Sequence, residues 1–285
     1  MRRVVHLSDL HFGNNDESLL APLQQAIAVI DPQVLVVSGD LVEHATEREF
    51  RNARAFLDSL PAPQIIVPGN HDLPFYNLIE RVLLRLGRYK RFITPNTAPE
   101  YSDEEIAIVG ANTSRIWPIR GGSISSTQLC TLETKFAALP ETLMRVLVTH
   151  HPFDLPATQH RNLIVGHARR AIATLAPFVD VLLAGHIHLS STGSTAARYK
   201  TQGHALAFVQ AGTAVSRRDK GEKNSFNSLR LGLTRTGEKA SVVERYSWNL
   251  AANQFEQQDS VEYQLGKEGW ARCESNQDAE VRITG

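Results

Sequence analysis

The chain has 285 residues, of which 42% are hydrophobic and 21% are charged, as is typical of a folded globular protein. Its 30 basic and 30 acidic side chains cancel, so nothing points to a strongly basic nucleic-acid-binding protein or to an acidic tail. Two cysteines are too few for a disulfide framework, and no apolar stretch approaches the ~18 residues of a membrane span, so we expect a cytoplasmic protein.

The first two thirds of the chain alternate short apolar runs with helical patterns, which indicates an α/β layered domain. Strands buried on both faces are predicted at 3–7, 34–37, 65–67, 146–149 and 181–184. Helices are predicted over 19–30 and 50–60, after Ser125, and from His167 to Leu175. The pairs Thr46 with Glu49 and Ser125 with Gln128 have the spacing of capping boxes.

Beyond about residue 203 the pattern changes to strands, predicted at 205–209, 228–233 and 240–248. A second sheet packed on the first is therefore expected. The predicted fold is a four-layer α-β-β-α sandwich of two mixed sheets flanked by helices. We assign residues 1–250 to this domain. Because the end of the chain is polar and lacks periodicity, we expect 251–285 to be a loosely ordered C-terminal extension.

The segment Leu73–Ile93 is rich in both aliphatic and basic residues, and three interpretations stay open. It can be a helix packed on the sheet with a solvated charged face. It can be a lid whose basic side guides an anionic substrate. It can also be an amphipathic helix that contacts lipid or an acylated substrate.

Side chains that bind transition metals directly follow five of the predicted strands. Ligands of α/β sheets bind outside the carboxyl ends of the strands, so we expect these side chains to meet. They are too many for one tetrahedral ion and suit two ions about 3.5–4 Å apart that share a carboxylate. The alternative is that they are ordinary turn and capping residues. The candidate ligands are Asp9, His11, Asp40, Asn70, His150, His186 and His188.

The motifs that contain these residues resemble those of the calcineurin-like metallophosphoesterases, in particular the bacterial single-domain branch that includes class III cyclic nucleotide phosphodiesterases. The resemblance covers residues 9–188. It is carried by Asp9-x-His11, Gly39-Asp40, Gly69-Asn70-His71-Asp72, His150 and Gly185-His186-x-His188.

The resemblance implies a role for each motif residue. One metal would take Asp9, His11, Asp40 and His188, and the other would take Asp40, Asn70, His150 and His186, with His150 preferred to the adjacent His151. A hydroxide bridging the metals would attack phosphorus in line. His71 would stabilise the developing charge or protonate the leaving oxygen, and Asp72 would hold the ring of His71 in the required tautomer. The metals would be Mn or Fe, with Zn also compatible.

The resemblance also implies an enzyme, a metal-dependent phosphohydrolase and most simply a phosphodiesterase acting on a small-molecule phosphoester, with cyclic AMP as the leading substrate. Two alternatives stay open: a pyrophosphatase for a nucleotide-linked lipid precursor of the UDP-diacylglucosamine type, and a non-catalytic scaffold of the same fold. A nuclease is disfavoured by the neutral net charge. Oligomeric state is left open, and membrane contact is expected only through Leu73–Ile93. Candidate substrate contacts are Arg115, Asn112 and His44.

Overall fold

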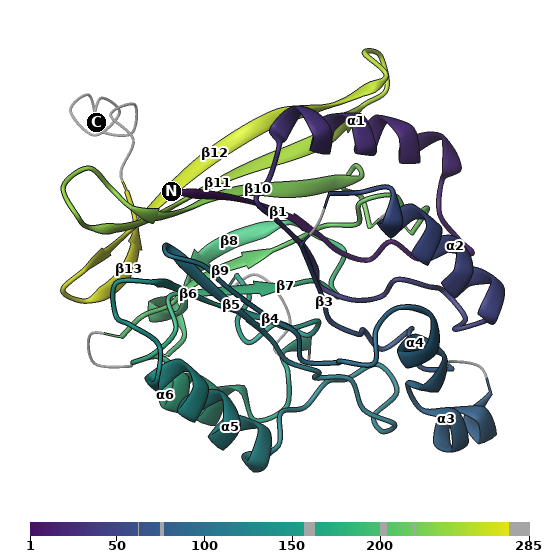
Figure 1. Cartoon of the computed structure of the whole chain (residues 1–285), viewed down its shortest axis with the longest axis horizontal. Coiled ribbons are helices and arrows are strands. Elements are labelled where there is room, and N and C mark those ends of the chain that lie inside the picture. The colour runs from purple at the N-terminus through teal and green to yellow at the C-terminus, as the bar shows by residue number, and fades with distance from the viewer. Residues whose placement is uncertain (62, 75–76, 157–162, 200–203, 219, 274–285) are drawn as a thin grey trace.

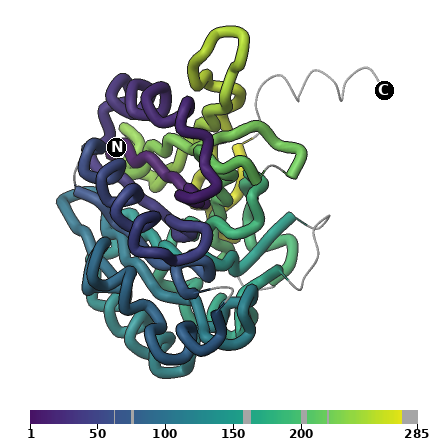
Figure 2. Tube along the Cα trace, turned by 90° about the vertical axis from the view of Figure 1, so that its right-hand side faces the viewer, coloured from purple at the N-terminus to yellow at the C-terminus, as the bar shows by residue number. Residues whose placement is uncertain are grey.

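The computed structural model describes residues 1–61, 63–74, 77–156, 163–199, 204–218 and 220–273. The described strands form two mixed sheets that lie face to face, and helices cover their outer faces (Figure 1). Figure 2 shows the purple helix near the N-terminus and the teal helices of the middle of the chain at opposite ends of the molecule. The predicted α-β-β-α sandwich is therefore confirmed.

The first sheet combines an N-terminal parallel part with a C-terminal antiparallel meander. Within the described residues its strand order is β13-β12-β11-β10-β1-β2-β3, and β1 pairs parallel with β2 and antiparallel with β10. The strands are β1 (Arg2–Leu7), β2 (Val34–Val37), β3 (Gln64–Ile66), β10 (Ser225–Leu233), β11 (Lys239–Asn249), β12 (Gln254–Gly266) and β13 (Gly269–Arg272).

The second sheet has the described order β4-β5-β6-β7-β9-β8, in which the four central strands run parallel to one another. Its strands are β4 (Glu100–Ser102), β5 (Ile106–Gly110), β6 (Met144–Val148), β7 (Val181–Ala184), β8 (Ser191–Ser194) and β9 (Ala207–Gln210). The carboxyl ends of β1, β2 and β3 in one sheet and of β6 and β7 in the other carry the predicted ligands, which is how the fold positions the site.

Three apolar clusters hold the layers together. One lies between the first sheet and helices α1 (Leu20–Ile30) and α2 (Glu47–Asp58), a second fills the space between the sheets, and a third lies under α5 (Ser126–Ala137) and α6 (Ala168–Leu175). Both predicted capping boxes are present, because Thr46 and Ser125 each cap a helix reciprocally with Glu49 and Gln128. Short 3-10 helices span Glu17–Leu19 and Thr195–Ala197.

The expectation of a loosely ordered segment after residue 250 needs correction for 254–272, which form β12 and β13. The Trp270 side chain on β13 is 2% exposed in the cluster between the sheets. Its Nε1 donates to Asp180 Oδ1 at 3.4 Å, and Asp180 also pairs with Lys239 of β11. Because β12 is mostly exposed on both faces, its sequence lacks the alternation that reveals a strand. Residues 274–285 lie outside the described residues.

The segment Leu73–Ile93 forms two short helices, α3 (Leu78–Leu84) and α4 (Gly87–Phe92), and residues 75 and 76 lie outside the described residues. Its first interpretation, a helix packed on the sheet with its charged face in solvent, is wrong for α3, because the aliphatic side chains are exposed and Arg81 is fully buried. In the part of the chain that the structure describes, every helix is too short or too polar to cross a membrane.

Candidate metal centre

All seven predicted ligands meet between the carboxyl ends of the two sheets. Six of them are buried, and His186 is partly exposed. Five of the seven have left-handed backbone conformations, with φ between 48° and 78°, which non-glycine residues rarely adopt. Backbone strain of this kind persists where the surroundings hold a residue in a particular place. The five are Asp9, His11, Asp40, His186 and His188.

Four of these side chains direct ligand atoms toward one point. The Nε2 atoms of His11 and His188 lie 3.2 Å apart, and His188 Nε2 is 3.3 Å from Asp9 Oδ1. Asp40 Oδ2 approaches His11 Nε2 at 3.8 Å. One ligand atom from each of the four side chains lies within 4.8 Å of the others, a grouping suited to a metal ion.

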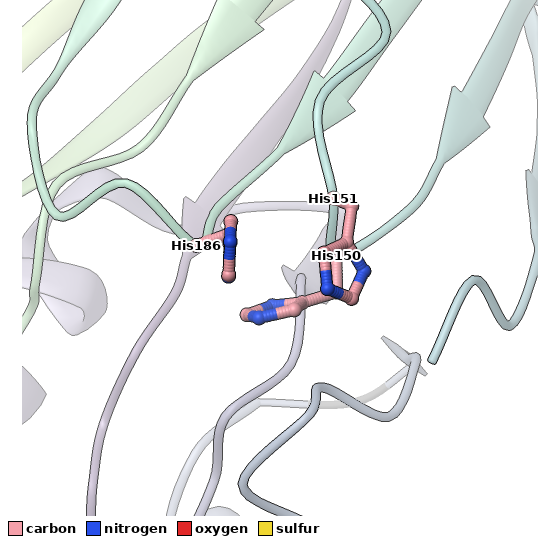
Figure 3. A group of neighbouring side chains, drawn as sticks. All are labelled: His150, His151 and His186. Carbon is pink, nitrogen blue, oxygen red and sulfur yellow. The ribbon is translucent and has the colours of Figure 1, made fainter. Parts of the chain in front are cut away.

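A second group shares Asp40 with the first. His150 Nε2 lies 3.3 Å from Asp40 Oδ2 and 3.1 Å from Asn70 Oδ1. The ring of His186 stands nearly perpendicular to that of His150, with 5.1 Å between the centroids (Figure 3). The same oxygen, Asp40 Oδ2, thus lies between His11 of one group and His150 of the other.

Three of the histidine rings have a polar partner at Nδ1, an ion pair for His11 and hydrogen bonds for His150 and His188. His11 Nδ1 faces Glu43 Oε2 at 3.1 Å, His150 Nδ1 faces the Ser38 carbonyl at 2.7 Å, and His188 Nδ1 faces the Arg218 carbonyl at 3.2 Å. Each acceptor favours a proton on Nδ1, so that Nε2 is the nitrogen that would bind a cation once it has lost its own proton. Metal-binding histidines are held in this way by outer partners.

The pKa shifts in the cluster show that its buried carboxylates favour positively charged neighbours. Burial alone raises the pKa of Asp9 and Asp40, but neighbouring histidines hold both pKa values well below the usual range. Burial also lowers the pKa of His11 and His150, yet the carboxylates outweigh it and raise each pKa to about 9. Asp9 Oδ1 is buried and, within the described residues, accepts no hydrogen bond. Two carboxylates, an amide and four imidazoles therefore fit divalent cations.

His151 adjoins His150 and lies in the same ring cluster, with its centroid 4.5 Å from that of His186 (Figure 3). Both of its ring nitrogens are engaged, however: Nδ1 with Thr113 Oγ1 at 2.9 Å and Nε2 with the Arg120 carbonyl at 3.3 Å. Because both ring nitrogens of His151 have partners, His150 stays the predicted ligand.

The predicted contact between Asp72 and His71 needs correction. The Asp72 carboxylate accepts from the backbone amides of Gly69, Leu41 and Val42 and so ties together the loops after β2 and β3. His71 Nδ1 instead faces the Glu43 carbonyl at 2.9 Å. A backbone carbonyl, rather than a carboxylate, therefore sets the tautomer of His71.

Two functional candidates, Glu43 and Arg218, were missed at the sequence level. Arg218 Nη2 donates to Glu43 Oε1 at 2.5 Å, and Nη1 lies 3.1 Å from His71 Nε2. Glu43 also orients His11, so one carboxylate links a candidate ligand to a cation at the mouth of the site. Nothing in the sequence marks Arg218, because it lies in a loop outside the motifs that carry the candidate ligands.

The three predicted substrate contacts do not gather at the cluster. His44 Nδ1 faces Glu49 Oε1 at 2.8 Å. The Arg115 guanidinium donates to Gln128 Oε1 and to the Ser114 carbonyl. Asn112 and Arg115 do line a cavity of about 640 Å³, together with apolar side chains that include Leu73 and Leu84. Their roles stay predictions.

A family model described as calcineurin-like phosphoesterase matches residues 2–190, about two thirds of the chain. The chain belongs to the calcineurin-like phosphoesterase family. The predicted resemblance is confirmed, and as a member of this family the protein is a metal-dependent phosphoesterase. The matched range contains all seven candidate ligands and His71.

Two curated relatives of this calcineurin-like phosphoesterase are phosphodiesterases by name. The 3',5'-cyclic adenosine monophosphate phosphodiesterase CpdA of Escherichia coli K12 is 29% identical over 202 residues, covering 65% of this chain and 69% of its own. The probable glycerophosphodiester phosphodiesterase GpdQ of Arcobacter nitrofigilis is 28% identical over 209 residues, covering 66% of this chain and 72% of its own.

Among solved structures, the purple acid phosphatase PPD1 of yellow lupin superposes with a TM-score of 0.69 at 13% identity over 92% of this chain. The chain spans about half of the lupin protein, 53% of its length. At this identity the likeness supports the fold alone.

Proposed function

We propose that the calcineurin-like phosphoesterase holds two divalent cations and hydrolyses a phosphodiester. Asp9, His11, Asp40 and His188 would bind one cation, and Asp40, Asn70, His150 and His186 the other. The observation that carries the proposal is the position of Asp40 Oδ2, 3.8 Å from His11 Nε2 and 3.3 Å from His150 Nε2. Mn and Fe suit this mixed nitrogen and oxygen ligand set, and Zn is compatible with it.

When bound, the cations would polarise the phosphoryl group and lower the pKa of a bound water. The chain's own contribution to charge at phosphorus would come from Arg218, whose guanidinium lies beside His71 and is partly exposed. Burial lowers the pKa of His71, as does the neighbouring charge of His11. A neutral His71 with its proton on Nδ1 presents a lone pair at Nε2. We therefore infer that neutral His71 accepts a hydrogen bond from Arg218 and so positions its guanidinium. His71 would donate a proton only after its Nε2 has been protonated.

Substitution of the shared carboxylate tests the cation proposal. Asp40→Asn weakens the one side chain that both sites use, so bound Mn should fall from two per chain to one or none. His71→Ala should keep both cations and lower kcat by ~10²–10⁴, as expected for loss of a group that acts on the phosphoryl centre. Loss of both cations in His71→Ala would contradict the role given to His71.

A cyclic nucleotide is the substrate we favour, because CpdA is named for cyclic AMP and covers most of this chain. The test is a panel with Mn that contains cyclic AMP, a glycerophosphodiester and a UDP-diacyl sugar. We expect the highest kcat/KM on cyclic AMP. Absence of turnover on all three would refute each of these substrate assignments.

The second candidate is a pyrophosphatase for a nucleotide-linked lipid precursor. The observation that favours it is the cavity beside Asn112, which Leu73, Leu84, Leu86 and Trp117 line with apolar surface. Preference for the UDP-diacyl sugar in the same panel would establish it. A non-catalytic scaffold would bind one Mn or none per chain and turn over nothing. A cytoplasmic location stays a prediction.

A further inference from the structure

Helix α3 exposes a continuous aliphatic face, which we call the apolar α3 surface and define as Leu78, Ile79, Val82 and Leu83. Ile79 and Leu83 are 73% and 74% exposed, and Leu78 and Val82 are 46% and 47% exposed. Residues four apart lie on the same face of a helix, so Leu78 with Val82 and Ile79 with Leu83 form adjacent rows. Contiguous exposed apolar surface of this kind marks an interaction site.

The outward orientation of this surface is fixed by Arg81, on the opposite side of α3. The Arg81 side chain is fully buried, and each of its three guanidinium nitrogens donates to backbone carbonyls. Turning the aliphatic face inward would expose these carbonyls or leave them unpaired, at a cost of ~1–3 kcal/mol for each unpaired group. The acceptors are the carbonyls of Asn70, Leu73, Pro74, Arg115, Ile116 and Ile119.

Exposed cations follow the apolar α3 surface in the chain. The ion pairs nearby join Arg88 to Glu80 and Arg91 to Glu47. Arg85 and Lys90 are exposed, and within the described residues neither has a carboxylate at ion-pair distance. Figure 1 shows α3 at the periphery of the molecule. An apolar face beside free cations has the chemistry that binds the interface of an anionic membrane.

The size of the surface argues against a second copy of the chain as its occupant. Its four side chains are far fewer than the ~20–30 residues that each partner contributes to a stable protein interface. Membrane attachment through an interfacial helix needs less area. Aliphatic side chains enter the headgroup region, and each nearby Lys or Arg adds ~1 kcal/mol on an anionic leaflet.

We propose that the apolar α3 surface, with Arg85 and Lys90, docks the protein on anionic phospholipid bilayers. The loop that carries Asn70 would then lie behind α3 as seen from the bilayer, since Arg81 bonds the Asn70 carbonyl from the inner side of the same helix. The proposal concerns attachment and does not depend on which phosphoester the enzyme hydrolyses.

Co-sedimentation of the full chain with vesicles tests the apolar part. We expect binding to vesicles of phosphatidylglycerol and phosphatidylcholine in equal parts, and at least tenfold weaker binding to phosphatidylcholine alone. Ile79→Glu with Leu83→Glu should abolish sedimentation. The matched control is Val29→Glu with Leu250→Glu, because these aliphatic side chains are 79% and 80% exposed on other elements. This control should bind like the unmodified protein.

A second pair of variants tests the charge. Arg85→Gln with Lys90→Gln should weaken binding to the anionic vesicles at least fivefold. Arg235→Gln with Lys267→Gln removes one exposed arginine and one exposed lysine at other places in the chain and should have no effect. Equal losses in both pairs would mean general charge attraction and would overturn the proposal.

Two further outcomes would also overturn it. One is the absence of binding to anionic vesicles. The other is concentration-dependent self-association in sedimentation velocity that Ile79→Glu with Leu83→Glu removes, which would identify a second copy as the occupant. Hydrolysis of bis(p-nitrophenyl) phosphate with Mn is measured in parallel and should be unchanged in Ile79→Glu with Leu83→Glu and in both control variants. Lack of hydrolysis with intact vesicle binding would contradict the proposed function alone.

Discussion

At the scale of single residues, the chain from His11 through Glu43 to Arg218 and His71 joins a candidate ligand to a cation at the mouth of the site. The convergence of the candidate ligands was predictable, because each lies at the end of an apolar strand and the carboxyl ends of strands converge. Glu43 and Arg218 were not, because their roles depend on contacts between loops 175 residues apart. The error about Asp72 has the same origin, since two of its three backbone partners, Leu41 and Val42, come from a different loop.

Arg218→Gln should lower kcat/KM by ~10²–10³ while both cations stay bound, because it removes positive charge beside the phosphoryl position without touching a ligand side chain. The measurement is steady-state kinetics with metal content. Arg217→Gln is the matched control, since Arg217 is the adjacent, exposed arginine. Equal effects in the two variants would contradict a specific role for Arg218.

Gly69→Ala should disrupt cation binding more than most single substitutions. A Cβ at this position would overlap Asp40 Oδ1 and the Asp40 amide nitrogen. Because the clash involves the backbone nitrogen of Asp40, the backbone at Asp40 would have to move. Gly87→Ala is the control, since a Cβ there meets no atom within 4 Å. Isothermal titration with Mn should show at least tenfold weaker binding for Gly69→Ala, and unchanged binding would refute the tight approach of these loops.

At the scale of elements, helical period and capping boxes were sufficient to predict α2 and α5, where local and tertiary preferences agree. They failed for α3, because periodicity assumes that aliphatic faces are buried. Here the Arg81 guanidinium, surrounded by backbone carbonyls, lies on the inner side of α3. The aliphatic side chains therefore lie on the outer side of the helix. Such a network forms between segments distant in sequence, so no pattern within the helix reveals it.

Arg81→Met should destabilise the fold by ~3 kcal/mol or more, because the buried carbonyls lose their donors. Urea unfolding followed by circular dichroism measures the change. The control is Arg51→Met on α2, where the side chain is 63% exposed and forms one ion pair with Glu47, for which we expect less than ~1 kcal/mol. A similar small loss in Arg81→Met would show that the carbonyl network does not hold α3.

At the scale of the whole molecule, the layered sandwich was predictable from the alternation of strands and helices. The two strands at its C-terminal edge were not. β12 and β13 were overlooked because an exposed edge strand carries polar side chains on both faces. The domain boundary at residue 250 rested on that polar composition. Trp270 shows that the C-terminal strands contribute to the core between the sheets.

Trp270→Ala should cost ~3–5 kcal/mol of unfolding free energy, as expected for removal of a buried aromatic side chain. Trp117→Ala is the matched control, because Trp117 is 58% exposed, and we expect a loss below ~1 kcal/mol. Both are measured by urea unfolding. Equal losses would mean that β13 adds little to the core between the sheets. The predicted domain boundary at residue 250 would then stand.

The central claim is that one carboxylate, Asp40, joins two cation sites. The most direct measurement is anomalous diffraction from crystals soaked in Mn. The account predicts two peaks about 3.5–4 Å apart with the Asp40 carboxylate between them. A single peak, or a peak bound by His151 in place of His150, would contradict it.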